Sequence, residues 1–334
     1  MRYIIIGAGA IGGTIGGRLY ESGHQVVLVA RGSQYQALHE QGLALTTPDL
    51  GTRVLPVPVA QGPQGVELAP EDVLVLAVKT QDTEAALVAW ADRPVAGGGT
   101  AGERLPLVIA QNGVENERLA LRRFARVYGM CVLLPASYLA AGSITAPCTP
   151  YTGMLTLGHY PPRAEADGTL RAIGEDLVKA GFLAPLAPDV MYWKYGKLVT
   201  NLVTTVEALC GTGGDPAAQR VAREAVAEAD RVLDAAGIAR ADAAEMADMR
   251  TGKVEKPPVS GAATGGSSWQ SLARGTGSIE ADHLNGEMVL LGRLHGVPVP
   301  VNEALQRLAN ASARERRAPG SLTGEELAAA VGLV

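Results

Sequence analysis

The sequence predicts an α/β fold in which a doubly wound parallel sheet is followed by a mostly α-helical domain. Up to about residue 188, short apolar runs alternate with helical patterns, as in βαβ units around a parallel sheet. Beyond that point, long segments carry apolar residues at spacings of three and four. A glycine-rich turn at residues 7–12 joins the first apolar run to the first helical pattern. We therefore divide the chain into domains 1–188 and 189–334.

The first half is expected to form strands at residues 3–6, 25–30, 73–78 and 107–110, and helices at 10–22 and 83–91. These strands are near-continuous apolar runs, which is typical of strands covered by helices on both faces. Residues 43–59 alternate Thr, Pro and Val, which favours one or two added edge strands. Further strands are expected at residues 126–134 and 155–159.

The second half is predicted to contain long helices at residues 190–209, 219–236, 281–295 and 302–316. Residues 253–268 are rich in Pro, Gly and Ser, which predicts a mobile loop inside this domain. Because a long loop without secondary structure in a compact domain is often a functional lid, this segment is a candidate lid over bound substrate.

Composition excludes several classes of protein. With 47% apolar residues among 334, the chain can bury a sizeable core, and its net charge of −5 argues against non-specific nucleic-acid binding. No stretch approaches the roughly 18 apolar residues of a membrane span. The three cysteines are widely spaced and the five histidines form no pair at metal-ligand spacing. We expect a cytoplasmic protein with no metal, no nucleic-acid partner and no membrane association.

The glycine-rich turn G-A-G-A-I-G has the spacing of a dinucleotide-binding loop. Gly7 would permit the tight turn, Gly9 would let the backbone approach a pyrophosphate, and Gly12 would let the helix pack close to the strand. The strand before it and the helix after it fall where a Rossmann-type domain needs them. The alternative is a turn that is merely rich in glycine.

The residue at the end of the second predicted strand indicates which dinucleotide binds. An NAD site usually has Asp or Glu about 20 residues beyond the glycines, where it holds the ribose hydroxyls. This chain has Arg31 there, which would donate charge-assisted hydrogen bonds of roughly 1.5–3 kcal/mol each to a 2′-phosphate. The sequence therefore predicts NADP(H), and the alternative is that Arg31 is an ordinary solvated arginine.

Two further polar segments follow predicted strands. Lys79 comes just after the strand at 73–78, and Gln111, Asn112 and Gly113 come just after the strand at 107–110. In open α/β sheets, ligands bind in the crevice at the carboxyl ends of the strands. An Asn-Gly turn and a solvated lysine would explain each segment alone, but not their shared placement.

One predicted helix of the second half carries polar residues on an apolar stripe. Trp193, Lys197, Asn201 and Thr205 recur every four residues, so a continuous helix would place them on one face. A lysine on a helix is usually solvated, but on an apolar stripe it needs a partner. The candidate partner is Glu280, near the start of another predicted helix.

These segments, in this order, resemble the ketopantoate reductase (2-dehydropantoate 2-reductase) family over nearly the whole chain. The matching pieces are G-A-G-A-I-G at 7–12, Arg31, Lys79, Q-N-G at 111–113, K-L-V-T-N at 197–201, Ser267 and Ser268, E-A-D-H-L-N-G at 280–286, and G-V-P-V-P-V-N at 296–302. The resemblance implies an NADP(H)-binding Rossmann domain at 1–188 and a helical, substrate-binding and catalytic domain at 189–334, similar to the C-terminal domain of 6-phosphogluconate dehydrogenase. The implied reaction is the NADPH-dependent reduction of ketopantoate, a small 2-oxo acid, to pantoate in pantothenate biosynthesis.

The resemblance also implies a role for each site residue. Lys197 would protonate the developing alkoxide, Asn112 would orient the carbonyl group and Lys197, and Glu280 would accept a hydrogen bond from a substrate hydroxyl. Asn201, Thr205 and Ser268 would bind the polar ends of the substrate. The implied cofactor contacts are Gly7, Ala8, Gly9, Ala10, Ile11, Gly12, Arg31, Lys79, Asn112 and Glu280.

One position departs from the family pattern. The family commonly has a second Asn four residues after Asn201, where this chain has Thr205, which lacks the reach of the amide. A missing polar contact can change which acid is preferred. Thr205 therefore favours, as one alternative, a related NADPH-dependent reductase of another 2-oxo acid or ketone. The other alternative, of a different class, is a non-catalytic NADP(H)-binding redox sensor. The apolar stripe of residues 219–236 can be buried internally or across a homodimer, the assembly that we favour.

Overall fold

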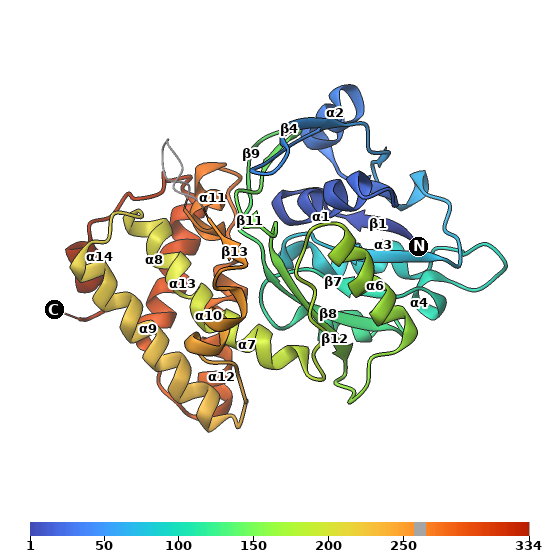
Figure 1. Cartoon of the computed structure of the whole chain (residues 1–334). Coiled ribbons are helices and arrows are strands. Elements are labelled where there is room, and N and C mark those ends of the chain that lie inside the picture. The colour runs from blue at the N-terminus through green and yellow to red at the C-terminus, as the bar shows by residue number, and fades with distance from the viewer. Residues whose placement is uncertain (257–264, 334) are drawn as a thin grey trace. The chain divides into compact units, whose positions relative to one another are not determined.

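The computed structural model describes residues 1–256 and 265–333 and divides into two compact units (Figure 1). The first unit comprises Met1–Lys194 and Ala247–Pro258, and the second comprises Tyr195–Met246 and Val259–Val334. The unit boundary falls inside helix α7 (Val190–Asn201), a few residues after the domain boundary predicted at 188.

The first unit is built on a seven-stranded sheet in the order β12-β8-β7-β6-β1-β2-β5. All neighbours in this sheet pair in parallel except β12, which is antiparallel to β8. The strands are β1 (Arg2–Ile6), β2 (Gln25–Val29), β5 (Val59–Ala60), β6 (Asp72–Leu76), β7 (Leu107–Ile109), β8 (Val127–Leu133) and β12 (Met154–Tyr160). The predicted parallel sheet and its strands are confirmed.

Helices cover both faces of this sheet. Tyr3 and Ile5 belong to one buried apolar cluster, and Ile4 and Ile6 belong to the other, because successive side chains of a strand point to opposite faces. The first cluster includes residues of α1 (Ala10–Glu21) and α6 (Gly168–Lys179), and the second includes residues of α3 (Thr83–Ala91), α4 (Ala101–Arg104) and α5 (Asn116–Leu121). The predicted helices at 10–22 and 83–91 are confirmed.

A second, four-stranded sheet has the order β4-β3-β10-β9. Its strands are β3 (Leu43–Thr47), β4 (Gly51–Leu55), β9 (Ser137–Ala140) and β10 (Ser143–Thr145). The strands predicted within residues 43–59 are therefore confirmed, but the expectation that they are edge strands added to the main sheet holds only for β5, because β3 and β4 belong to this separate sheet. The reason is that β3 pairs in parallel with β10, a partner far away in the sequence.

Helix α1 packs closely on both sheets because of its two glycine pairs. A Cβ atom on Gly16 would lie 2.6 Å from Leu28 of the main sheet, and one on Gly12 would lie 2.9 Å from the side chain of Ile5. On the other side, a Cβ on Gly13 would lie 2.2 Å from Ile144 of β10. Since real Cβ contacts are not this short, the bare backbone is what lets α1 lie between the two sheets.

Smaller elements complete the first unit. They are α2 (Gly32–Gln41), the 3₁₀ turns η1 (Pro63–Gly65) and η2 (Thr80–Asp82), and the short pair β11 (Thr149–Pro150) and β13 (Val254–Glu255). Helix α10 (Ala243–Arg250) spans the second boundary between the units.

The second unit is helical. Its elements are α8 (Val203–Cys210), α9 (Pro216–Ala235), α11 (Ser267–Ala273), the 3₁₀ turn η3 (Glu280–His283), α12 (Asn285–His295), α13 (Pro300–Arg314) and α14 (Gly324–Ala330). The apolar stripe of α9 packs inside the unit, where Val221 and Ala225 join Leu305 of α13 and Leu327 of α14 in one buried cluster. This stripe therefore gives no support to the expected homodimer.

Two predicted helices are interrupted. The helix expected at 190–209 is split at Leu202, whose N–H is shared between the carbonyl oxygens of Leu198 (3.2 Å) and Val199 (3.3 Å). The hydroxyls of Thr200 and Thr204 donate back to carbonyl oxygens of the preceding turn, an interaction that weakens a helix and bends it. The helix expected at 281–295 begins only at residue 285, after η3.

Candidate active site

The three motif glycines have distinct environments at the first strand-to-helix turn. Gly7 has φ +106°, and a Cβ there would lie 2.8 Å from backbone atoms after β6. A Cβ on Gly12 would lie 2.1 Å from the Gly7 carbonyl oxygen, whereas one on Gly9 would have no heavy atom within 4 Å. The loop is thus closed where the chain turns and packs, and open at Gly9, where a phosphate would approach the start of α1.

Arg31 follows β2 as the N-cap residue of α2. Its side chain is 76% exposed, and its Nη2 lies 3.6 Å from Oδ1 of Asp82. Such an exposed ion pair contributes little to stability, so the guanidinium can reorient towards a phosphate. Lys79 is half-buried at the N-cap position of η2, after β6.

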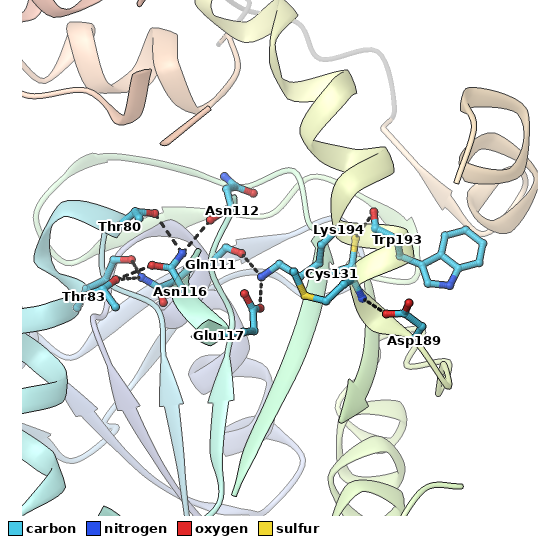
Figure 2. Close-up of polar contacts among 12 residues, drawn as sticks. Thr80, Thr83, Gln111, Asn112, Asn116, Glu117, Cys131, Asp189, Trp193 and Lys194 are labelled. Atoms are coloured by element: carbon cyan, nitrogen blue, oxygen red, sulfur yellow. Dashed lines mark hydrogen bonds and ion pairs between the residues drawn. The ribbon is translucent and has the colours of Figure 1, made fainter. Parts of the chain in front are cut away.

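Buried hydrogen bonds join the segments that follow β6 and β7 (Figure 2). Gln111 Nε2 donates to the Val78 carbonyl oxygen and to Thr83 Oγ1, both at 2.8 Å. Thr83 Oγ1 donates to Asn116 Oδ1 at 2.8 Å, and Asn116 Nδ2 donates to the Asn112 carbonyl oxygen at 3.1 Å. The two polar strand ends expected to share one rim of the sheet therefore lie together.

A buried ion pair, which was not predicted from the sequence, lies beside this network. Lys194 of α7 donates to the carboxylate of Glu117 at the start of α5, and its Nζ also donates to the Gln111 carbonyl oxygen at 3.1 Å (Figure 2). Burial raises the pKa of the Glu117 carboxyl group, and the Lys194 ammonium opposes that shift. The only sign of this pair in the sequence is a second lysine one helical turn before Lys197.

In the second unit, Thr204 connects two of the predicted substrate residues. Its hydroxyl donates to the Asn201 carbonyl oxygen at 2.7 Å and lies 3.0 Å from Ser268 Oγ. Ser268 is buried in the first turn of α11. Just before that helix, the Gly266 N–H donates to Glu207 Oε2 of α8 at 3.4 Å. Thr204 and Glu207 were not predicted, because nothing in the sequence separates them from other polar helix residues.

The remaining predicted residues of this unit have different environments. Lys197 is half-buried in α7, and Glu280 is buried in η3, so Glu280 lies in a 3₁₀ turn where a helix start was expected. Thr205 is fully buried, and its hydroxyl donates to Asn285 Oδ1 at 2.6 Å. The Thr205 hydroxyl therefore has an internal partner where the resemblance implied a substrate contact, and the Lys197–Glu280 pair stays a prediction.

The predicted lid is only partly described. Residues 257–264 lie outside the described part of the chain, and the described ends of the segment belong to β13 and α11. Across residues 1–256 and 265–333, no group of three or more His, Cys, Asp or Glu could hold a metal ion. Nor is any helix in those ranges long and apolar enough to cross a membrane.

A mostly parallel sheet with this glycine loop at its first strand-to-helix turn is typical of a dinucleotide-binding domain. Comparison with known proteins gives the family. The model "Ketopantoate reductase PanE/ApbA" matches residues 3–161, and "Ketopantoate reductase PanE/ApbA C terminal" matches residues 189–313. The chain belongs to the ketopantoate reductase family of oxidoreductases, which act on CH–OH groups, so the resemblance seen in the sequence is confirmed.

Individual relatives agree with this assignment. A 2-dehydropantoate 2-reductase from Archaeoglobus fulgidus is 27% identical over 319 residues, covering 92% of this chain and 96% of the relative. A PanE/ApbA family ketopantoate reductase from Ralstonia eutropha has a TM-score of 0.76 at 25% identity, covering 95% of this chain and 100% of that one. D-mandelate dehydrogenase, solved with NADH and anilino(oxo)acetate, has a TM-score of 0.74 at 20% identity, with coverages of 95% and 99%. The same fold therefore also occurs in a dehydrogenase that is named for a different substrate, mandelate.

Proposed function

We propose that the chain reduces ketopantoate to pantoate with NADPH. Family membership supports the substrate class, and the open backbone at Gly9 is the observation that carries the dinucleotide site, whereas the choice of NADPH rests on Arg31. The first unit would bind the dinucleotide. The second unit, which holds Lys197 and the linked Asn201 and Ser268, would bind the substrate.

The residues of the first unit fit a nicotinamide dinucleotide. The backbone from Gly7 to Gly12 would hold the pyrophosphate at the start of α1, where N–H groups have no side-chain cap. The residue that follows β2 is Arg31, where an NAD site usually has an acidic residue. The site therefore favours a 2′-phosphate, and hence NADPH over NADH. Lys79, which follows β6, and Asn112, which follows β7, would add further contacts to the bound dinucleotide.

The chemistry divides between the cofactor and the chain. The nicotinamide would supply the hydride to the keto carbon of the substrate. Lys197 would donate a hydrogen bond to the carbonyl oxygen and then a proton to the developing alkoxide, assistance worth about 10²–10⁴ in rate. Asn112 would orient the carbonyl group, and Glu280 would accept a hydrogen bond from a substrate hydroxyl.

A second candidate function rests on Thr205. Asn201 and Ser268 remain as substrate contacts, but the Thr205 hydroxyl donates inside the helical unit, to Asn285. With one family contact missing, a different 2-oxo acid could be preferred, because discrimination depends on which polar groups find partners. The second candidate is therefore an NADPH-dependent reductase of another 2-oxo acid.

The test is NADPH oxidation with ketopantoate beside a panel of other 2-oxo acids. The proposal predicts the highest kcat/KM with ketopantoate. A higher value with another acid would favour the second candidate, and no oxidation with any acid would contradict both.

A further inference from the structure

The backbone around Asn112 is held on both sides by buried side chains. Lys194 Nζ donates to the Gln111 carbonyl oxygen, and Asn116 Nδ2 donates to the Asn112 carbonyl oxygen, each at 3.1 Å. The next residue, Gly113, has φ +77°, a conformation that glycine adopts without strain. The peptide groups on either side of the Asn112 Cα therefore have one defined orientation, which in turn limits the directions that its side chain can take.

The charged members of this arrangement are almost completely removed from water. Lys194 is 3% exposed, Glu117 is not exposed at all, and their ion pair lies against the chain turn after β7 (Figure 2). A buried ion pair is weak evidence for stability, because apolar residues of similar size often replace one without loss. Stability alone therefore does not account for the pair, whereas its position against the Gln111 carbonyl group suggests a geometric role.

Three elements converge on this point. Glu117 comes from the start of α5, Gln111 follows β7, and Lys194 comes from α7. Gly129 of β8 makes room for them, since a Cβ there would lie 2.7 Å from Val190 Cγ1 and 3.3 Å from Glu117 Oε1. The ion pair thus ties the beginning of α7 to the turn that carries Asn112.

We propose that the Lys194–Glu117 pair is a positioning device that orients Asn112 for the reaction. This inference rests on the proposed function, which assigns Asn112 to the carbonyl group. Lys194 contacts both Glu117 and the Gln111 carbonyl oxygen, so the pair acts through the turn and its members are positioning residues. Helix α7, which they anchor, also carries Lys197 one turn beyond Lys194.

The first test removes the pair without leaving an unpaired charge. The double variant Lys194→Met, Glu117→Leu replaces both charged groups by apolar ones of similar size, which avoids the cost of burying a lone charge. If the pair acts through Asn112, the double variant lowers kcat about tenfold to a hundredfold when Asn112 is present, and about twofold or less in an Asn112→Ala background. The same loss in both backgrounds, or no loss when Asn112 is present, would overturn the proposal.

The second test does not depend on activity. Amide hydrogen exchange across residues 111–117 should be faster in the double variant than in the native chain, because the turn has lost one of its two anchors. The double variant Arg2→Met, Asp72→Asn is the matched control: it removes a partly buried pair at the amino ends of β1 and β6 without leaving a buried charge unpaired, and should leave exchange at 111–117 unchanged. Unchanged exchange in the double variant would overturn the inference. If the native chain reduces no 2-oxo acid, the proposed function fails, and exchange alone decides the positioning role.

Discussion

Replacing Gly9 with Ala adds one methyl group at the start of α1, and we predict that it weakens NADPH binding without disturbing the fold. The added Cβ would have no heavy atom within 4 Å, and φ −82° with ψ −159° suits any L-residue. The free energy of unfolding should change by less than about 1 kcal/mol, since Ala reduces the entropy of the unfolded chain but is a poorer N-cap than Gly. The methyl group would instead occupy the space that a phosphate needs. Losing one charge-assisted backbone hydrogen bond costs about 1.5–3 kcal/mol, or roughly 10- to 150-fold in the dissociation constant.

Two other glycines serve as controls for this variant. Gly168, at the start of α6, also has open space around its Cβ position, so Gly168→Ala should leave NADPH binding unchanged and raise the melting temperature slightly. Gly12→Ala should lower the melting temperature sharply, because its Cβ would lie 2.1 Å from the Gly7 carbonyl oxygen. Calorimetric titration with NADPH and thermal unfolding measure the two effects separately. NADPH binding by Gly9→Ala as tight as that of the native chain would refute the placement of the phosphate at this backbone.

Three further predictions concern single side chains. Lys197→Ala should lower turnover by about 10²–10⁴, as expected for a lost proton donor, with little change in the NADPH dissociation constant measured by titration; loss of both together would show that Lys197 holds the cofactor. Arg31→Ala should reduce the preference for NADPH over NADH, measured as the ratio of their kcat/KM values, about tenfold to a hundredfold. An unchanged preference would show that Arg31 does not bind the 2′-phosphate. Burial, with Asp215 and Glu326 nearby, raises the pKa of the Cys210 thiol to about 11, so its alkylation by iodoacetamide should be slow at neutral pH and accelerate as the pH approaches that value. Rapid labelling of Cys210 at neutral pH, seen by mass spectrometry of peptides, would contradict this environment.

The parts of the fold that the sequence predicts well are those whose contacts are local. The first strand, the glycine turn, α1 and the second strand follow one another within a single βαβ unit, and β1 and β2 pair directly. The separate small sheet was missed because β3 pairs with β10, so its formation depends on residues that are distant in the chain. The break at Leu202 was missed because spacing alone does not reveal that nearby threonine hydroxyls compete for helix carbonyl groups.

The candidate site shows the same division. The polar ends of β6 and β7 were expected at one rim, because parallel strands end at the same edge of a sheet, and the hydrogen bond from Gln111 to Val78 joins them. The Lys194–Glu117 pair was not predicted, because its members are 77 positions apart and belong to different elements. NADPH specificity, the homodimer and the cytoplasmic location stay predictions.

The most direct test of the proposed reaction follows the hydride itself. The chain would be incubated with ketopantoate and NADPH carrying deuterium at both positions of the nicotinamide C4, and the product examined by mass spectrometry. Reduction by direct transfer predicts pantoate with one deuterium at the former keto carbon, and the Lys197→Ala variant should form far less of it. Absence of deuterated pantoate with the native chain, although it binds NADPH, would contradict the proposed reaction.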